Sequence, residues 1–215
     1  MVFDGVIFHR HRCVFFHIGK TAGVSIEKWL DNNSYDVTQS NTDVMFGWDK
    51  EKSVYLQHAS MHLTQEMVDS ETFNNYYKFS VVRNPYSRAI SVYYYLYDQH
   101  QKKFGSFENY IHTLPELLKS PNIYNGSHHI PQTYYTHIEG TCFCDHIAKF
   151  EELPSSLSKI QKQLNLNLLP QHYNRYSHPQ RQTRPRTEIY SKKMIQIMQD
   201  IYAGDFEKFD YDPLP

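Results

Sequence analysis

The chain has 215 residues, of which 40% are hydrophobic and 15% aromatic, enough apolar side chain for a folded core, so it is not an intrinsically disordered chain. This length predicts one domain over residues 1–215, without room for a separate partner domain. A formal net charge of −1 gives no overall attraction for nucleic acid or an anionic membrane, so neither is expected as a partner.

The cysteines and the N-terminal region bear on the compartment. Cys142 and Cys144 are too close for an easy bridge, and with Cys13 they do not form the even set of a disulfide framework. The N-terminal region has no apolar segment of a secretion signal, and no stretch approaches the length of a membrane span. We therefore expect a cytoplasmic protein with reduced thiols.

The first predicted elements are a buried strand over residues 13–18 and an amphipathic helix over 22–31. Between them lies the tripeptide Gly19-Lys20-Thr21. A turn at a helix N-terminus presents unbonded backbone N–H groups and the positive end of the helix dipole to an anion. Lys20 adds a mobile charge, and Thr21 and Ser25 add hydroxyl groups. This pattern predicts an anion-binding loop.

The loop differs from the P-loop of nucleotide kinases. That motif requires a glycine five residues before the Gly-Lys-Thr, and the chain has Val14 there. A polar loop is predicted over 32–52, followed by a short histidine-containing segment at 54–62 and a helix near 64–70.

Thirteen histidines raise the question of a metal site. His58 and His62 have the four-residue spacing of helical zinc ligands, but no glutamate follows His58 as the common zinc motif demands. We therefore expect no metal.

A second buried strand is predicted over 77–83, and it ends in Arg83. Enzymes that bind a magnesium nucleotide usually carry a carboxylate in that place, whereas a guanidinium suits bidentate recognition of phosphate. Asn84 can cap the following helix, predicted over 85–100, and Pro85 fits its first turn. Ser91 lies two turns beyond Arg83, where both can share a second phosphate.

The later elements alternate between helix and strand. A helix over 107–118 is capped by Ser106; a loop covers 120–132, a strand 145–150 and a helix 155–164. Thr187 is the predicted cap of the last helix and Gly204 its stop, with an apolar face of Ile189, Met194, Ile197, Met198 and Ile201. This order predicts an α/β, P-loop-like three-layer fold, a mainly parallel sheet flanked by helices. Ligands of such sheets bind at the carboxyl ends of the strands, where Lys20 and Arg83 fall.

Two segments resemble the cofactor motifs of sulfotransferases, most closely the carbohydrate O-sulfotransferase branch with its heparan and uronosyl enzymes and soluble bacterial relatives. Residues 16–25, FHIGKTAGVS, resemble the loop F-x-H-I-P-K-T-A-G-T-S for the 5′-phosphosulfate. Residues 82–93, VRNPYSRAISVY, resemble V-R-N-P-x-x-R-x-x-S-x-Y for the 3′-phosphate. Gly19 replaces the loop proline and Val24 replaces a threonine.

Weaker similarities follow in the family's order along the chain. They comprise the histidine segment 57–60, the Pro-Gln stretch at 130–133, the strand end at 147–153 and the closing pattern Y-x-x-D-x-x-x-F-x-Y at 202–211.

The resemblance implies a donor, an acceptor and a set of site residues. The implied donor is 3′-phosphoadenosine 5′-phosphosulfate (PAPS), the implied product is adenosine 3′,5′-bisphosphate (PAP), the expected acceptor is a hydroxyl of a sugar or glycan, and no metal is required. His58 is the expected base, with His62 as runner-up, and Lys20 stabilises the leaving group. The expected nucleotide contacts are His17, Gly19, Lys20, Thr21, Ala22, Gly23, Val24, Ser25, Arg83 and Ser91. Arg175, Arg184 and Arg186 are candidate contacts for an acidic glycan.

Two other functions remain open from the sequence. One is a P-loop-type nucleotide kinase with a degenerate motif, against which Val14 and the missing strand-terminal aspartate count. The other is a non-catalytic nucleotide- or glycan-binding relative that kept the fold.

Overall fold

A computed structural model describes residues 6–30, 43–52, 54–95, 97–119, 128–166 and 185–215. The chain divides into two compact units. Unit 1 comprises Met1–Val82 and Tyr134–Asn174, and unit 2 comprises Arg83–Thr133 and Arg175–Pro215. The assignment of 1–215 to a single domain stays a prediction.

The centre of unit 1 is a four-stranded sheet in the order β1-β2-β5-β8. β2 pairs in parallel with β5, and β5 with β8, whereas β1 pairs with β2 antiparallel. The register sets Phe16 opposite Ser80 and Val82 opposite Lys149, so the parallel strands present their carboxyl ends at one edge. The strands are β1 (Ile7–Phe8), β2 (Cys13–Phe16), β5 (Tyr77–Val82) and β8 (His146–Lys149).

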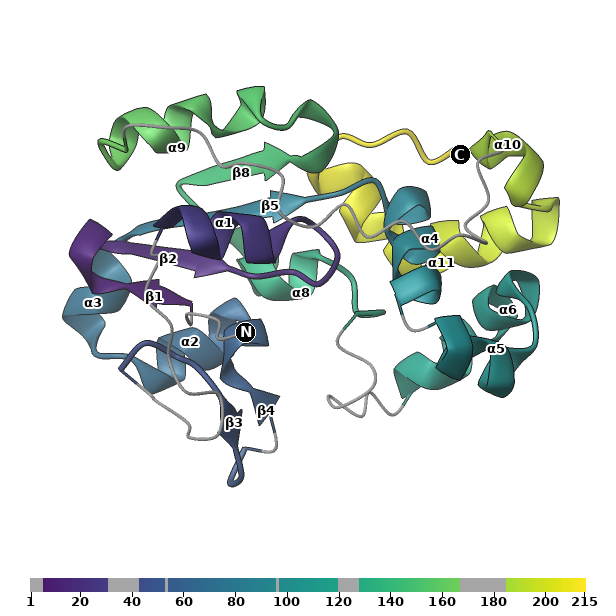
Figure 1. Ribbon diagram of the computed structural model, residues 1–215, viewed down its shortest axis with the longest axis horizontal. Coiled ribbons are helices and arrows are strands. Elements are labelled where there is room, and N and C mark those ends of the chain that lie inside the picture. Colours follow the sequence, from purple (N-terminus) through teal and green to yellow (C-terminus); the bar gives the residue numbers. More distant parts are fainter. Residues whose placement is uncertain (1–5, 31–42, 53, 96, 120–127, 167–184) are drawn as a thin grey trace. The chain divides into compact units, whose positions relative to one another are not determined.

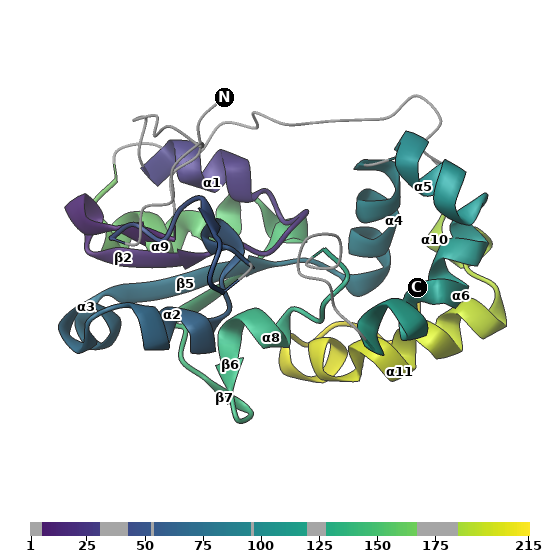
Figure 2. The same cartoon turned by 90° about the horizontal axis from the view of Figure 1, so that it is seen from below.

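Helices cover both faces of this sheet. α1 (Gly23–Leu30) and α9 (Ser158–Gln163) lie over one face, and α2 (Met61–Met67) and α3 (Ser70–Asn75) over the other (Figures 1 and 2). Side chains alternate between the two faces along each strand. Those on the face covered by α1 and α9 form a buried cluster with residues of both helices. Its members include Cys13, Phe15, Ile26, Leu30, Phe79, Val81, Ala148, Leu157 and Ile160. The predicted α/β fold with a mainly parallel sheet flanked by helices is confirmed.

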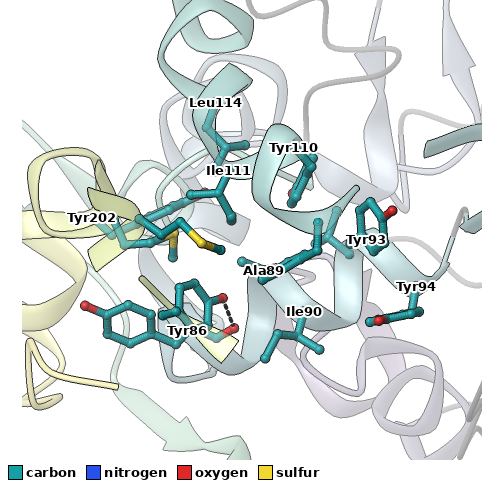
Figure 3. Close-up of a cluster of buried hydrophobic side chains, with 14 of the residues drawn as sticks. Tyr86, Ala89, Ile90, Tyr93, Tyr94, Tyr110, Ile111, Leu114 and Tyr202 are labelled. Carbon is teal, nitrogen blue, oxygen red and sulfur yellow. Dashed lines mark hydrogen bonds between the residues drawn. The ribbon is translucent and has the colours of Figure 1, made fainter. Parts of the chain in front are cut away.

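Unit 2 is helical, with α4 (Pro85–Tyr95), α5 (Tyr97–Phe104), α6 (Phe107–Lys119), α10 (Arg186–Ile189) and α11 (Lys192–Lys208). Its core joins α4, α6 and α11, and Figure 3 shows Ala89 and Tyr93 of α4 close to Tyr110 of α6. The tyrosines of α4 are mostly core residues, as their helical spacing indicates, although Tyr95 is exposed.

The predicted start signals of two helices are confirmed. The Asn84 side chain accepts a hydrogen bond from the N–H of Ser87 at 3.2 Å, and Pro85 is the first residue of α4. Likewise, Ser106 Oγ accepts from the N–H of Asn109 at 3.1 Å, at the start of α6. These signals are readable in sequence because a cap bonds to a residue only three positions away.

The predicted ends of the last helix are wrong. Thr187 lies inside the short α10, and the N-cap of α11 is Ser191, whose Oγ accepts from Met194 N. Between them Tyr190 is extended and buried, donating its hydroxyl to Tyr86 O at 2.8 Å, so core packing breaks the helix there. Gly204 does not stop α11, because the buried Phe206 holds the next turn in the core of unit 2 and outweighs the low helix propensity of one glycine.

Other segments also differ from the predictions. Two hairpins were not predicted, β3 (Trp48–Asp49) with β4 (Val54–Tyr55) and β6 (His137–Ile138) with β7 (Thr141–Cys142). The single helices predicted near 64–70 and 85–100 are two pairs, α2 with α3 and α4 with α5, and the 155–164 segment opens with a 3-10 turn. The remaining short elements are α8 (Thr133–Thr136), η1 (His9–His11), η2 (Leu56–His58), η3 (Phe150–Glu152) and η4 (Ser155–Leu157).

All three cysteines have free thiols. Across the described residues, no helix combines the length and the apolar character that crossing a bilayer requires.

Candidate functional site

The loop between β2 and α1 has an unusual backbone. Lys20 and Ala22 adopt left-handed conformations, with φ of 70° and 74°, although neither is a glycine. Thr21 Oγ1 donates to Ile18 O at 2.7 Å, which ties the turn to the end of β2. Left-handed residues alternating with others direct successive backbone N–H groups into one concavity that suits an anion. The loop leads directly into α1 at Gly23, so the helix N-terminus adds its own N–H groups.

A buried histidine–glutamate pair lies beside this loop. His17 Nδ1 is 2.6 Å from Glu27 Oε1, and the two residues are 8% and 2% exposed. Because a carboxylate oxygen accepts, Nδ1 of His17 carries the proton and the pair holds the ring in one orientation. Glu27 was missed by the sequence analysis. The available signal was a charged residue at the core-facing helical spacing of Gly23, Glu27 and Leu30.

Gly23 leaves room for the His17 ring. A Cβ atom built at Gly23 would lie 1.9 Å from His17 Nε2 and 2.0 Å from Cδ2. The ring therefore packs directly on the first turn of α1, at the predicted anion-binding loop. Any larger residue at position 23 must displace a buried ring that Glu27 holds.

We expect Gly23→Ala to disrupt the loop. Overpacking of this kind destabilises by about 1–3 kcal/mol, and displacement of His17 should also weaken, about tenfold, the PAP binding that the sequence predicts. Thermal unfolding and titration calorimetry with PAP measure the two effects. Gly204→Ala is the matched control, because the Cβ there would meet its nearest atom at 3.6 Å and alanine favours the helix. Wild-type PAP affinity in Gly23→Ala would contradict this account of the loop.

The structure brings His58 to the same loop. His58 ends η2, is half-buried, and its Nδ1 lies 3.0 Å from the carbonyl oxygen of His17. The two imidazole rings are 4.6 Å apart between centroids. Because the carbonyl only accepts, Nδ1 of His58 is the donor and carries a proton. His62, by contrast, has a 65% exposed side chain on α2 beside Glu66.

The remaining predicted site residues are distributed as follows. Lys20 and Val24 are half-buried in the loop, and Ser25 is buried in α1. In unit 2, Arg83 is 8% exposed and follows the last residue of β5, and Ser91 is half-buried on α4.

Of the three arginines predicted to contact a glycan, the structure describes Arg186. Arg186 opens α10 and donates from its guanidinium to Ser87 Oγ at 3.3 Å. Arg175 and Arg184 lie outside the described residues. Within the described ranges, no group of three or more His, Cys, Asp or Glu side chains is arranged to hold a metal ion.

A comparison with known families assigns the chain. The model of a sulfotransferase family matches residues 4–212, nearly the whole length. No curated protein and no solved structure matches at a significant level. The matched residues include the loop after β2, His17, His58, Arg83 and the closing pattern at 202–211. The chain therefore belongs to the sulfotransferase family and is an enzyme of sulfuryl transfer.

Proposed function

We propose that this enzyme transfers the sulfuryl group of PAPS to a hydroxyl of a carbohydrate, with His58 as the base. The observation that carries this proposal is the placement of His58 on the anion-binding loop, through the bond from its Nδ1 to His17 O. A loop suited to the leaving phosphate and a histidine beside that loop are two groups that hydroxyl sulfation can use.

The residues of the loop fit the 5′ end of such a nucleotide. Left-handed residues 20 and 22 and the α1 N-terminus supply backbone N–H groups, and Lys20 supplies a cation. PAPS supplies a sulfuryl group on a phosphate leaving group. As that phosphate departs, its negative charge increases, so N–H groups and a lysine at this end stabilise the transition state more than the ground state. The sequence resemblance assigns the 3′-phosphate to Arg83 and Ser91.

Two separate contacts of His17 place the proposed base. Glu27 orients His17, and the main-chain carbonyl of His17 receives the N–H of His58. In this proposal, Nε2 of His58 accepts the proton of the attacking hydroxyl, whose own pKa is far above neutral. His17 and Glu27 are therefore positioning residues in this proposal, and His62, exposed on α2, is the weaker candidate for the base.

The carbohydrate acceptor rests on the resemblance to the carbohydrate branch of the family. Arg175, Arg184 and Arg186 are proposed contacts for the acidic groups of a glycan. The family match does not support the kinase alternative, and a non-catalytic binding relative is separated from an enzyme by the assay below.

The function is tested by nucleotide binding and transfer. We expect PAP to raise the free energy of unfolding by about 2.7 kcal/mol at ~100 times its dissociation constant, and Mg-ATP to have a much smaller effect. With labelled PAPS, label should appear on glycan acceptors such as uronic-acid polysaccharides rather than on simple phenols. Preference for Mg-ATP would contradict the donor, labelled phenols would contradict the acceptor, and PAP binding without any transfer would indicate a binding relative.

A further inference from the structure

A buried polar network in unit 2 holds the main chain of Arg83. Gln132 Oε1 accepts from the N–H of Arg83 at 2.8 Å, and Gln132 Nε2 donates to Arg83 O at 2.8 Å. One side-chain amide therefore bonds to both peptide groups of Arg83, as a neighbouring strand would. We infer that Gln132 and Asp205 are positioning residues that hold Arg83 for recognition of the 3′-phosphate, an inference that rests on the proposed function.

Asp205 determines which way the Gln132 amide faces. Its Oδ2 accepts from Gln132 Nε2 at 3.2 Å and from Gln132 N at 2.9 Å, and its Oδ1 accepts from Thr133 N at 2.9 Å. A carboxylate only accepts, so the NH₂ end of the amide must face it. A reversed amide would place an oxygen against both Asp205 and the Arg83 carbonyl, and an NH₂ against the Arg83 N–H. The network is therefore consistent in one orientation only.

The network is fully enclosed. Gln132 and Asp205 are both 0% exposed, so neither group has water as an alternative partner. Burial raises the pKa of Asp205, while the N–H groups of Gln132 and Thr133 and the nearby Arg88 act against that rise. Arg88 also donates to Ile130 O at 2.9 Å, which anchors the segment that carries Gln132.

This arrangement suits the role proposed for Arg83. A guanidinium recognises phosphate through two parallel N–H bonds, and this geometry depends on where its Cα starts. With both flanking peptide groups held by Gln132, the Arg83 side chain begins from one backbone conformation. If the amide is lost, the peptide groups of residue 83 can rotate, and the bidentate contact has to be ordered again in every binding event.

The test compares PAP with 5′-AMP, which lacks the 3′-phosphate. In Gln132→Glu, an acceptor replaces both N–H donors, and in the milder Asp205→Asn the volume is kept while an acceptor becomes a donor. We expect each variant to weaken PAP binding by about tenfold and to change 5′-AMP binding by less than twofold. The matched controls are Gln196→Glu and Asp200→Asn. These two residues form an exposed Gln–Asp hydrogen bond of 2.8 Å on α11, the helix that carries Asp205. The controls should leave both affinities unchanged.

The outcomes separate this inference from the proposed function. Three results would overturn the inference and assign the network to stability alone. The variants could lose affinity for PAP and 5′-AMP by the same factor, they could keep the wild-type affinities, or both could fail to fold. Arg83→Ala is measured in parallel. If it weakens PAP and 5′-AMP equally, the assignment of the 3′-phosphate to Arg83 fails. If Arg83→Ala selectively weakens PAP while the network variants keep the wild-type ratio, only the positioning role of Gln132 and Asp205 fails.

Discussion

Replacing His58 with alanine should lower the rate of sulfuryl transfer on the order of 10²–10⁴-fold, while the affinity for PAP stays nearly unchanged. In the proposed site the base is the Nε2 atom of His58, whose Nδ1 donates to His17 O. Removing the imidazole should not unfold the loop, since Glu27 holds the His17 ring independently. Steady-state assays with labelled PAPS and calorimetry with PAP measure the two quantities.

The pH profile and a second variant sharpen this test. In the wild type, the rate should rise with pH as the imidazole loses its proton, because only neutral imidazole accepts one. This rise should disappear in His58→Ala. His62→Ala is the internal control and should change the transfer rate little, because His62 is exposed on α2. Full activity in His58→Ala, or a large loss in His62→Ala, would contradict the assignment of the base.

Replacing Lys20 with alanine should reduce the transfer rate by on the order of 10²–10³-fold, a larger factor than the loss in PAP affinity. Charge on the leaving phosphate increases toward the transition state, so a cation at this end contributes most there. The backbone at residue 20 has φ of 70°, and alanine keeps the Cβ that lysine has, so the strain of the loop is unchanged. The expected effect is therefore that of the ammonium group.

The comparison of rate and affinity decides the role of Lys20. Single-turnover rates and PAP titrations are needed for the wild type, for Lys20→Ala and for Lys28→Ala, a half-buried lysine further along the same segment. Lys28→Ala should leave the rate within a few-fold of wild type. If the rate and the affinity of Lys20→Ala fall by the same factor, Lys20 only anchors the nucleotide.

The elements that local signals determine were predicted well. Residues 13–30 and 77–95 read as strand, turn and helix because apolar runs, a Gly-Lys-Thr turn and the Asn84–Pro85 cap act over a few positions. The helix ends near 187–204 were predicted wrongly because Tyr190 and Phe206 are placed by packing in the core of unit 2, which overrides the propensity of Thr187 and Gly204.

By itself the sequence determined the family, the fold class and the two motif segments, since each depends on residue types at short, fixed spacing. Only the tertiary structure placed Glu27 against His17, ten residues away, and His58 on the carbonyl of His17, 41 residues away. It alone brought Gln132 and Asp205 to Arg83, with Gln132 49 residues from Arg83 and Asp205 73 residues from Gln132. Contacts of this kind have no periodic signature, because they form only when separate elements pack and leave buried polar groups that must be bonded.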